Sequence, residues 1–531
     1  MNKQSNFILS ILIIAAGLYS CNKEGDNNTT LKKPNILFCI ADDASFEHMG
    51  AYGCSWVKTP GFDRVANEGI LFNRAYTPNA KCSPSRSCIL TGRNSWQLEE
   101  AANHVPKFPS KFKTYFEALK DNGYFTGHTA KGWAPGDPGE INGQKRQLVG
   151  PAFNKHTIEP PAKHISGNNY TENFKDFLSQ KPEDKPFCFW YGSTEPHRAY
   201  EFGAGINKGD KKLEDIDRVP AFWPDNDSVR TDMLDYAFEI EYFDLHLQKM
   251  LAYLEEIGEL DNTLIVVTSD NGMPFPRIKG QEYELSNHLP LAIMWKNGIK
   301  KPGREVNDYV SFIDFVPTFL EVAGLSLEKS GMAAFQGLSL SDIFNSEKSG
   351  IVNPKRDHVL IGKERHDVGR PNDWGYPIRG IIKDDMLYIE NFETSRWPSG
   401  NPETGYLNCD GSPTKTVCLD SRLMADRKKY WDLNFGKRIE EEMYKVDVDR
   451  DCMTNLALNA SYSELKRNLK EQMYKELQAQ EDPRMFGNGQ YFDNIKYVDP
   501  NTTNFYERYM NDEKMNAGWV NLSDFEENPL D

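Results

Sequence analysis

The sequence contains few cysteines, no excess of basic residues and no apolar run long enough to span a bilayer. None of its nine cysteines forms a Cys-x-x-Cys pair that would suggest zinc, and their irregular spacing is not that of a disulfide framework. The 62 Lys and Arg residues are outnumbered by 78 Asp and Glu, a net charge of −16, so the basic face that nucleic acid binding requires is lacking. A polyanion can still bind where a pocket is locally basic.

The apolar stretch from Phe7 to Leu18 is typical of the core of a signal peptide. It ends in Leu-Tyr-Ser-Cys, residues 18–21, which resembles a bacterial lipobox. We therefore predict a lipoprotein signal peptide over 1–20, lipidation of Cys21 and a polar tether over 21–33. This predicts an exported lipoprotein that is anchored to the bacterial outer membrane. A plain secretory peptide with an incidental cysteine is the alternative.

Strand-like and helix-like segments alternate over the first 350 residues. We expect buried strands at 34–41, 124–130, 186–192 and 263–269, and helices at 113–122 and 233–254, where apolar residues recur three and four apart. Such alternation predicts an α/β fold with a mostly parallel central sheet, flanked by helices on both faces. The active site of such a fold lies beyond the carboxyl ends of the strands. We assign the catalytic domain to 34–350.

The pattern changes after about Gly350. Residues 377–391 and 444–447 predict a small antiparallel sheet, and 463–478 a helix, which together give a smaller C-terminal α+β subdomain over 351–480. Residues 481–531 are polar, with aromatics and little periodicity, and we interpret them as an ordered wrapping tail. Cys409 and Cys418 flank a turn-like Asp-Gly-Ser-Pro, and we expect them to be unpaired.

Two of the expected strands end in pairs of oxygen-bearing side chains. Asp42 and Asp43 follow the first strand, and Asp270 and Asn271 follow the strand at 263–269. Hard oxygen ligands of this kind suit Ca²⁺. A single Asp-Asp pair at a strand end more often serves as a cap or a turn. Two acidic strand ends that bracket a reactive loop favour a metal site.

That loop reads Cys-Ser-Pro-Ser-Arg at residues 82–86 and continues to Thr91-Gly92-Arg93. It resembles the signature of the type I, formylglycine-dependent sulfatases, which share an alkaline-phosphatase-like fold. The resemblance implies that a formylglycine-generating maturase oxidises Cys82 to formylglycine (3-oxoalanine). One hydroxyl of the hydrated aldehyde then attacks sulfur, and the other expels sulfate by re-forming the aldehyde. An ordinary small buried cysteine is the alternative reading of Cys82.

The resemblance also implies the other members of the site. Arg86 would hold the formylglycine hydroxyls, Lys131 and Lys279 would contact sulfate, and His197 would bind sulfate and protonate the leaving group. Arg277 competes with Lys279, and the sequence does not settle which of the two points inward. The Ca²⁺ ligands implied by the family are Asp42, Asp43, Cys82, Asp270 and Asn271.

Three further residues are predicted to contact the substrate. Glu195 and Arg198 flank His197 in the segment Glu-Pro-His-Arg. Trp133 stands two residues after Lys131, where the family often has a histidine, and we predict that it walls the sugar site. The role of the missing histidine stays unassigned, with His128 as an upstream alternative.

Segments 43–47, 195–198, 270–276 and 376–379 look most like the heparan N-sulfatase (N-sulfoglucosamine sulfohydrolase) branch and related bacterial sulfatases. We therefore predict a Ca²⁺-dependent sulfatase that acts on a sulfated saccharide. The first candidate substrate is N-sulfoglucosamine at the end of heparan sulfate, a glycosaminoglycan.

An O-sulfatase for another host or algal glycan is the alternative. A phosphoryl hydrolase or transferase of the alkaline phosphatase superfamily would usually carry Ser or Thr as its nucleophile. An inactive glycan-binding lipoprotein would be favoured by loss of the cysteine or a metal carboxylate.

Overall fold

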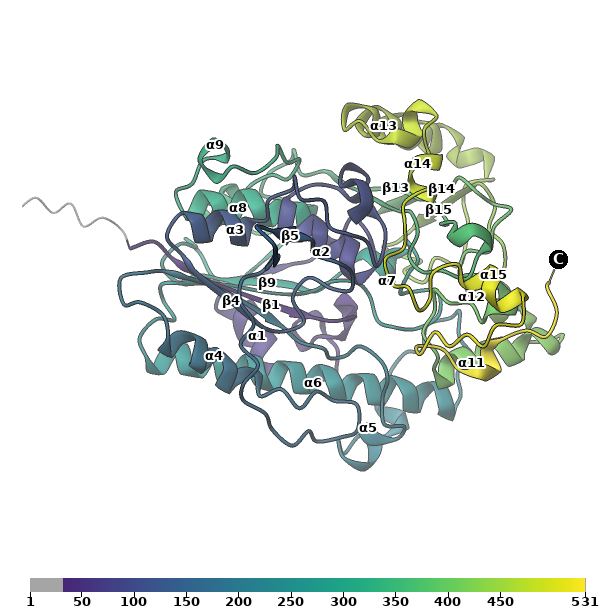
Figure 1. Cartoon of the computed structure of the whole chain (residues 1–531), viewed down its shortest axis with the longest axis horizontal. Coiled ribbons are helices and arrows are strands. Elements are labelled where there is room, and N and C mark those ends of the chain that lie inside the picture. The colour runs from purple at the N-terminus through teal and green to yellow at the C-terminus, as the bar shows by residue number, and fades with distance from the viewer. Residues whose placement is uncertain (1–31, 531) are drawn as a thin grey trace, which may run out of the picture. The chain divides into compact units, whose positions relative to one another are not determined.

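A seven-stranded sheet lies at the centre of the computed structural model, which describes residues 32–530 (Figure 1). Among the described strands of this sheet, β9 alone runs antiparallel to its neighbours, which confirms the mostly parallel α/β fold. In spatial order the strands are β10 (Arg304–Val306), β2 (Ile70–Phe72), β9 (Leu291–Met294), β8 (Thr263–Ser269), β1 (Asn35–Ala41), β7 (Phe187–Gly192) and β4 (Phe125–Ala130).

Helices cover both faces of this sheet, because the central strands are apolar on both sides. In β1, Ile36 and Phe38 belong to one hydrophobic core, and Leu37 and Cys39 belong to the other. The first core is covered by α2 (Cys82–Thr91), α3 (Tyr115–Asp121) and α8 (Phe315–Val322). The second is covered by α1 (Pro60–Asn67), α4 (Tyr170–Ser179) and the long α6 (Asp227–Glu256), which follows the expected 3–4 apolar spacing (Figure 1).

A second, four-stranded sheet is antiparallel throughout, as the sequence predicted for the C-terminal part. It comprises β12 (His358–Lys363), β13 (Ile378–Lys383), β14 (Met386–Asn391) and β15 (Glu441–Lys445). Helix α13 (Ser463–Ala479) packs on it through apolar side chains at Leu469, Met473 and Leu477. Residues from Lys33 onward form one compact unit, so the change near residue 350 marks a change of sheet within that unit.

The segment after α13 packs back against the earlier chain. Asp482 accepts hydrogen bonds from Arg379, and Tyr497 and Phe505 share a small core with Leu407. The remaining short strands are β3 (Ala75–Tyr76), β5 (Glu140–Ile141), β6 (Gln144–Lys145) and β11 (Val310–Ser311). The short helices are α5 (Ala204–Asn207), α7 (Glu284–Asn287), α9 (Leu327–Ser330), α10 (Ser341–Phe344), α11 (Pro413–Asp420), α12 (Lys428–Phe435), α14 (Gln490–Asp493) and α15 (Phe505–Met510).

The predicted signal peptide, Cys21 and most of the tether lie outside the described residues. In the part of the chain that the structure describes, no helix has the length and apolar character needed to cross a membrane. Cys409 and Cys418 are both free thiols, as expected.

Candidate active site

Four neighbouring parallel strands, β8, β1, β7 and β4, deliver the polar residues of the site at one edge of the sheet. Asp270 follows β8, Asp42 follows β1 and Lys131 follows β4, while His197 lies five residues beyond β7. The register places Ala41 of β1 opposite Ser269 of β8, so the two acidic strand ends are adjacent. Parallel pairing thus brings together residues that are far apart in the sequence.

The turn after β1 points both of its carboxylates into the site. Asp43 has a φ of 77°, a left-handed conformation that costs free energy in a residue other than glycine. Two hydrogen bonds hold the turn: the Asp43 N–H donates to Asp270 Oδ1 (3.1 Å) and the Ala44 N–H donates to Ser269 Oγ (2.7 Å). The strained turn is therefore fixed by the neighbouring strand end.

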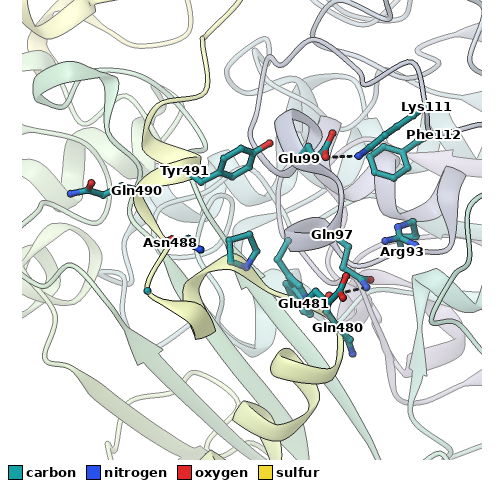
Figure 2. Close-up of a pocket in the computed structure, with 13 residues that line it drawn as sticks. Arg93, Gln97, Glu99, Lys111, Phe112, Gln480, Glu481, Asn488, Gln490 and Tyr491 are labelled. Carbon is teal, nitrogen blue, oxygen red and sulfur yellow. Dashed lines mark hydrogen bonds and ion pairs between the residues drawn. The ribbon is translucent and has the colours of Figure 1, made fainter.

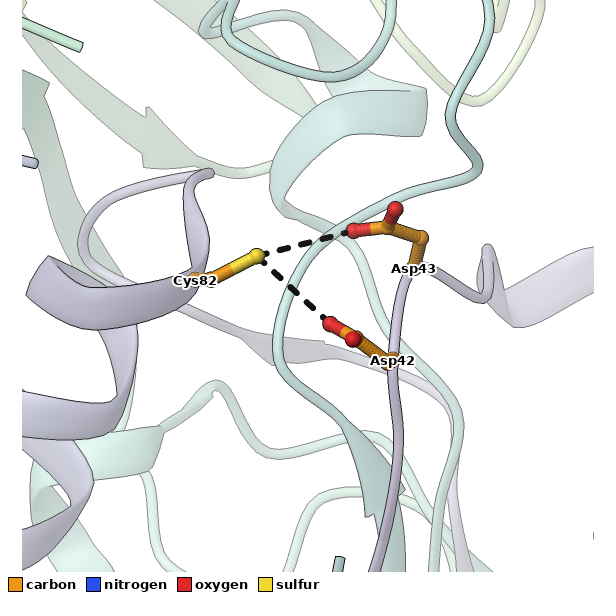
Figure 3. A group of neighbouring side chains, drawn as sticks. All are labelled: Asp42, Asp43 and Cys82. Atoms are coloured by element: carbon orange, nitrogen blue, oxygen red, sulfur yellow. Dashed lines mark hydrogen bonds between the residues drawn. The ribbon is translucent and has the colours of Figure 1, made fainter. Parts of the chain in front are cut away.

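Cys82 is the first residue of α2, and its side chain points at this turn (Figure 3). Its Sγ lies 3.5 Å from Asp42 Oδ1 and 3.9 Å from Asp43 Oδ1. Burial raises the pKa of the thiol well above its ordinary value, so the sulfur of an unmodified cysteine stays protonated. A protonated thiol is a poor nucleophile.

Arg86 lies one turn further along α2 and joins three segments of the site. Its Nε donates to Asp270 Oδ2 (2.8 Å), and its Nη1 donates to the carbonyl oxygens of Lys131 (3.1 Å) and Gly132 (2.9 Å). Its Nη2 is 3.5 Å from Asp42 Oδ1. The guanidinium is fully buried, and such a charge is tolerated because it is paired with carboxylates and saturated with acceptors.

Two lysines complete the cluster of charges. The Nζ of Lys131 lies 2.7 and 2.6 Å from the two oxygens of Asp42. The Nζ of Lys279 lies 2.7 Å from Asp43 Oδ2 and 2.9 Å from Asp410 Oδ2. Burial opposes the charge of each ammonium, but the adjacent carboxylates outweigh it and hold the pKa of both lysines above the ordinary value.

The structure settles which of the two cations after Asn271 points inward. Arg277 donates to the carbonyl oxygens of Leu433 and Cys452 and stacks on Tyr283, away from the carboxylates. Lys279 is the residue that reaches the site.

The oxygen-bearing residues fit a divalent cation. One ligand atom each from Asp42, Asp43 and Cys82 lie within 4.8 Å of one another. The Asn271 amide donates to Asp43 Oδ1 (2.7 Å), while its own Oδ1 is buried and has no hydrogen-bond partner among the described residues. A buried carbonyl oxygen without a donor, set beside two carboxylates, is a donor set that Ca²⁺ prefers. The carboxylate of Asp270, the other predicted ligand, adjoins this set and also accepts hydrogen bonds from the Asp43 N–H and Arg86 Nε.

Glu195 and Arg198 lie elsewhere than the sequence suggested. Glu195 is buried and accepts hydrogen bonds from the Ser166 N–H (2.7 Å) and the Tyr170 hydroxyl (2.7 Å). Arg198 makes a two-bond contact with Asp232 (2.7 and 2.8 Å). Both side chains hold the loop that carries His197. Neither lines the cavity that contains Cys82. The predicted contact with substrate is therefore replaced by a role in positioning this loop.

Trp133 also differs from its predicted place. Its indole N–H donates to Ser87 Oγ (2.8 Å) and its ring packs edge-on against Phe108, so it supports α2 from within the hydrophobic core. Trp133 is absent from the cavity lining, so its predicted role as a wall of the sugar site is replaced by this supporting role. His128, the alternative for the missing histidine, donates from Nδ1 to the Gly150 carbonyl oxygen (3.0 Å) and is not part of the cavity lining.

A cavity of about 450 Å³ opens in front of Cys82. Lys131, His197 and Lys279, the three residues predicted to contact sulfate, all line it. His197 donates from Nδ1 to the Arg198 carbonyl oxygen (2.6 Å), its Nε2 lies 3.9 Å from Asp43 Oδ2, and 34% of its side chain is exposed. The imidazole is therefore oriented and still accessible to a ligand.

Several lining residues were not predicted from the sequence. They come from loops and from the C-terminal segment: Lys81, His104, Asp367, Asp410, Tyr497, Asp499 and Trp519. Lys81 adjoins the Cys82 motif, and this adjacency is the sequence feature that could have identified it as a site residue. The others stand in segments without periodicity or motif, so local sequence gave no reason to select them.

A separate surface groove runs between the segment after α2 and the segment after α13 (Figure 2). Its Lys111 is already paired with Glu99 (2.5 Å), and Gln97 donates to the Gln480 carbonyl oxygen (3.2 Å). It contains neither Cys82 nor the carboxylates beside it. We therefore assign the chemistry to the cavity at the strand ends.

Comparisons with known proteins agree with this geometry. A family model described as Sulfatase matches residues 34–325, more than half of the chain. An N-acetylglucosamine-6-O-sulfatase of Bacteroides thetaiotaomicron is 28% identical over 437 residues, which cover 65% of this chain and 76% of the relative. The N-sulphoglucosamine sulphohydrolase of Homo sapiens is 27% identical over 490 residues, covering 85% of this chain and 91% of that protein.

The fold also recurs among solved structures. One, described as a complex with its substrate D-glucosamine-2-N,6-O-disulfate, superposes with a TM-score of 0.61 at 21% identity. The match covers 85% of this chain and 99% of that one.

Proposed function

The chain belongs to the sulfatase family, whose members are sulfuric ester hydrolases, and we propose that it releases sulfate from a glycan in the cavity that contains Cys82. One observation carries the proposal: Cys82, at the start of α2, faces two carboxylates, while the ammonium groups of Lys131 and Lys279 border the same cavity. A sulfate group needs this density of positive charge to enter an otherwise acidic protein.

We propose that residue 82, a cysteine in this structure, is converted to formylglycine by a maturase, and that Asp42, Asp43, Asp270, Asn271 and the modified residue 82 hold Ca²⁺. These groups, when present, supply a nucleophilic hydroxyl and a Lewis acid that polarises it. The side chains of the chain itself then have separate roles. Arg86 fixes the position of the carboxylates through its hydrogen bond to Asp270. Lys131 and Lys279 line the cavity and bring positive charge to the sulfate oxygens.

His197 is the proposed proton donor to the leaving group. The bond from Nδ1 to the Arg198 carbonyl oxygen fixes the ring, and Nε2 is the nitrogen left for the substrate. A sugar alkoxide or amide is a poor leaving group and requires a proton as the bond to sulfur breaks.

His197→Ala should therefore lower kcat/KM for a sulfated sugar by about 10²- to 10⁴-fold. The loss should be much smaller for 4-nitrophenyl sulfate, because its leaving group departs without protonation. His128→Ala is the matched control, since that histidine contacts the Gly150 carbonyl outside the cavity lining. Equal losses on both substrates would contradict the assignment of His197 as the acid.

The substrate we propose is a sulfated glucosamine at a chain end, as in heparan sulfate. The two relatives support this, since one is named for 6-O-sulfate on N-acetylglucosamine and the other for N-sulfoglucosamine. Residues of the C-terminal segment, Tyr497, Asp499 and Trp519, border the cavity and add aromatic and polar surface suited to one sugar ring. N-sulfoglucosamine remains our first candidate and 6-O-sulfated N-acetylglucosamine the second.

The test is release of inorganic sulfate from a panel of defined saccharides by protein produced together with a maturase. The panel contains N-sulfoglucosamine, 6-O-sulfated N-acetylglucosamine and a sulfated galactose. Cleavage of the galactose alone would keep the sulfatase function and overturn the choice of sugar. Hydrolysis of 4-nitrophenyl phosphate in place of every sulfate would favour the phosphoryl hydrolase alternative.

We also propose that the protein is an exported lipoprotein of the outer membrane, anchored through Cys21. In bacterial cells fed an alkyne-labelled fatty acid, the wild-type chain should carry the label and fractionate with the outer membrane. Cys21→Ser should lose both properties, because the acylated thiol is gone. Labelling of the Cys21→Ser chain would contradict the anchor at Cys21. Recovery of the wild-type chain as a soluble, processed protein would favour the plain secretory peptide.

A further inference from the structure

His104 lies in a cluster of three buried ionisable side chains at the edge of the catalytic cavity. Its Nδ1 is 3.0 Å from Asp367 Oδ1, and the other oxygen of Asp367 is 2.7 Å from the Nζ of Lys81. All three side chains are at least nine-tenths buried, and all three line the cavity. We call Lys81, His104 and Asp367 the His104 cluster.

The second ring nitrogen of His104 is unpaired. Its Nε2 is buried and has no hydrogen-bond partner among the described residues. A buried polar atom without a partner costs free energy unless something else satisfies it. No group among the described residues pairs with Nε2, and the ring borders the cavity, so a group bound in the cavity is the partner that remains available to it.

The cluster determines what kind of partner this is. Burial opposes the charge of Asp367, but the adjacent Lys81 ammonium, together with the hydrogen bond from His104, outweighs burial and holds the pKa of the carboxyl far below its ordinary value, so Asp367 is an acceptor. His104 therefore donates from Nδ1 to Asp367. Burial also lowers the pKa of His104, so the ring is neutral and Nε2 carries a lone pair.

A lone pair at this position does not suit sulfate. Ionised sulfate oxygens have no hydrogen to donate, and the cations Lys131 and Lys279 line the same cavity and suit them better. The Nε2 acceptor instead matches an O–H or N–H group. In a sulfated sugar such donors are the free hydroxyls and the amide or sulfamate N–H.

The cluster is tied directly to the Cys82 turn. Lys81 precedes Cys82 in the chain, and the Val105 N–H, one residue after His104, donates to Ser83 Oγ (3.3 Å). This places the cluster next to Cys82, the proposed site of attack on sulfur. We propose that His104 is a specificity-determining residue, which accepts a hydrogen bond from a hydroxyl or N–H of the sugar that carries the sulfate. The inference rests on the proposed sulfatase function and adds a requirement for a donor on the substrate.

The test compares His104→Ala and His104→Gln with wild type in the matured, full-length protein. Two quantities are measured: kcat/KM for the saccharide that the panel identifies, and the inhibition constant of inorganic sulfate, which has no sugar. We expect a fall of about 10- to 100-fold in kcat/KM, which corresponds to the cost of about 1–3 kcal/mol for leaving one polar group unpaired. The sulfate inhibition constant should stay within about twofold, whereas Lys131→Ala should weaken both.

A set of monodeoxy analogues of the saccharide then locates the donor. For wild type, one analogue should lose about 10-fold or more in kcat/KM, and for His104→Ala the same analogue should lose almost nothing further, because the partner is already absent. A uniform loss of saccharide turnover and sulfate inhibition would overturn the inference in favour of a structural role. Unchanged saccharide turnover in a folded His104→Ala protein would also overturn it, whereas partial recovery in His104→Gln, which keeps an acceptor oxygen, would support it. Absence of sulfate release by wild type would instead refute the proposed function.

Discussion

Cys82→Ala is expected to abolish sulfate release and to leave the fold intact. The loss of the nucleophile should lower kcat by on the order of 10⁴-fold or more. Stability should change little, because the substitution removes one sulfur atom from the first turn of α2 and places a good helix former there. Sulfate release and the thermal midpoint of unfolding are the two measurements.

Cys88→Ala provides the matched control for this prediction. Cys88 lies on the same helix and is equally buried, but it belongs to the hydrophobic core and not to the group of Asp42, Asp43 and Cys82. It should retain most of the activity. Mass spectrometry of the peptide that contains residue 82 should show the aldehyde in active protein. Substantial turnover by Cys82→Ala would end the formylglycine proposal.

Removal of the divalent cation is expected to have a comparable effect. Excess chelator should abolish turnover by wild type, and added Ca²⁺ should restore it, because the carboxylates at the end of β1 are arranged to hold an ion. Ca²⁺ at about 100 times its dissociation constant should also stabilise the folded protein by about 2.7 kcal/mol, seen as a rise in the thermal midpoint.

Asp42→Asn distinguishes the loss of a Ca²⁺ ligand from the loss of any negative charge in the cavity. The variant should lose both the activity and the Ca²⁺-dependent rise in the midpoint, since it removes a ligand charge next to Cys82. Asp499→Asn also removes a cavity carboxylate but lies outside the group of potential ligands, so it should keep the Ca²⁺ effect. Full activity of wild type in excess chelator would show that the acidic strand ends serve only the structure.

The strand ends could be placed from the sequence because adjacent residues mark each strand and its end, and because parallel strands share one arrangement in a sheet. A buried β-branched or apolar run that stops at Asp42 or at Asp270 predicts a parallel strand, and parallel strands end at the same edge of a sheet. The register of β1 on β8 then leaves little freedom in where the carboxylates meet. For the same reason the 3–4 spacing was enough to predict α6.

The direction of individual side chains after those strands could not be read in the same way. Arg277 and Lys279 are two residues apart in a loop, where no period relates sequence spacing to a face. Arg277 has a φ of 67°, and this turn sends its guanidinium to the carbonyls of Leu433 and Cys452 while Lys279 reaches Asp43. Glu195 and Arg198 adjoin His197 in the motif, yet their partners on α4 and α6 turn them away from the cavity.

The chain by itself determined the chemistry of the centre: a cysteine at a helix start, two acidic strand ends and the cations that balance them. Only the tertiary structure decided what surrounds that centre. His104 and Asp367 meet across 263 residues of sequence, and Trp519 reaches the cavity from the C-terminal segment. Such contacts depend on how loops pack over the finished sheet, and no local pattern of apolar residues records that packing.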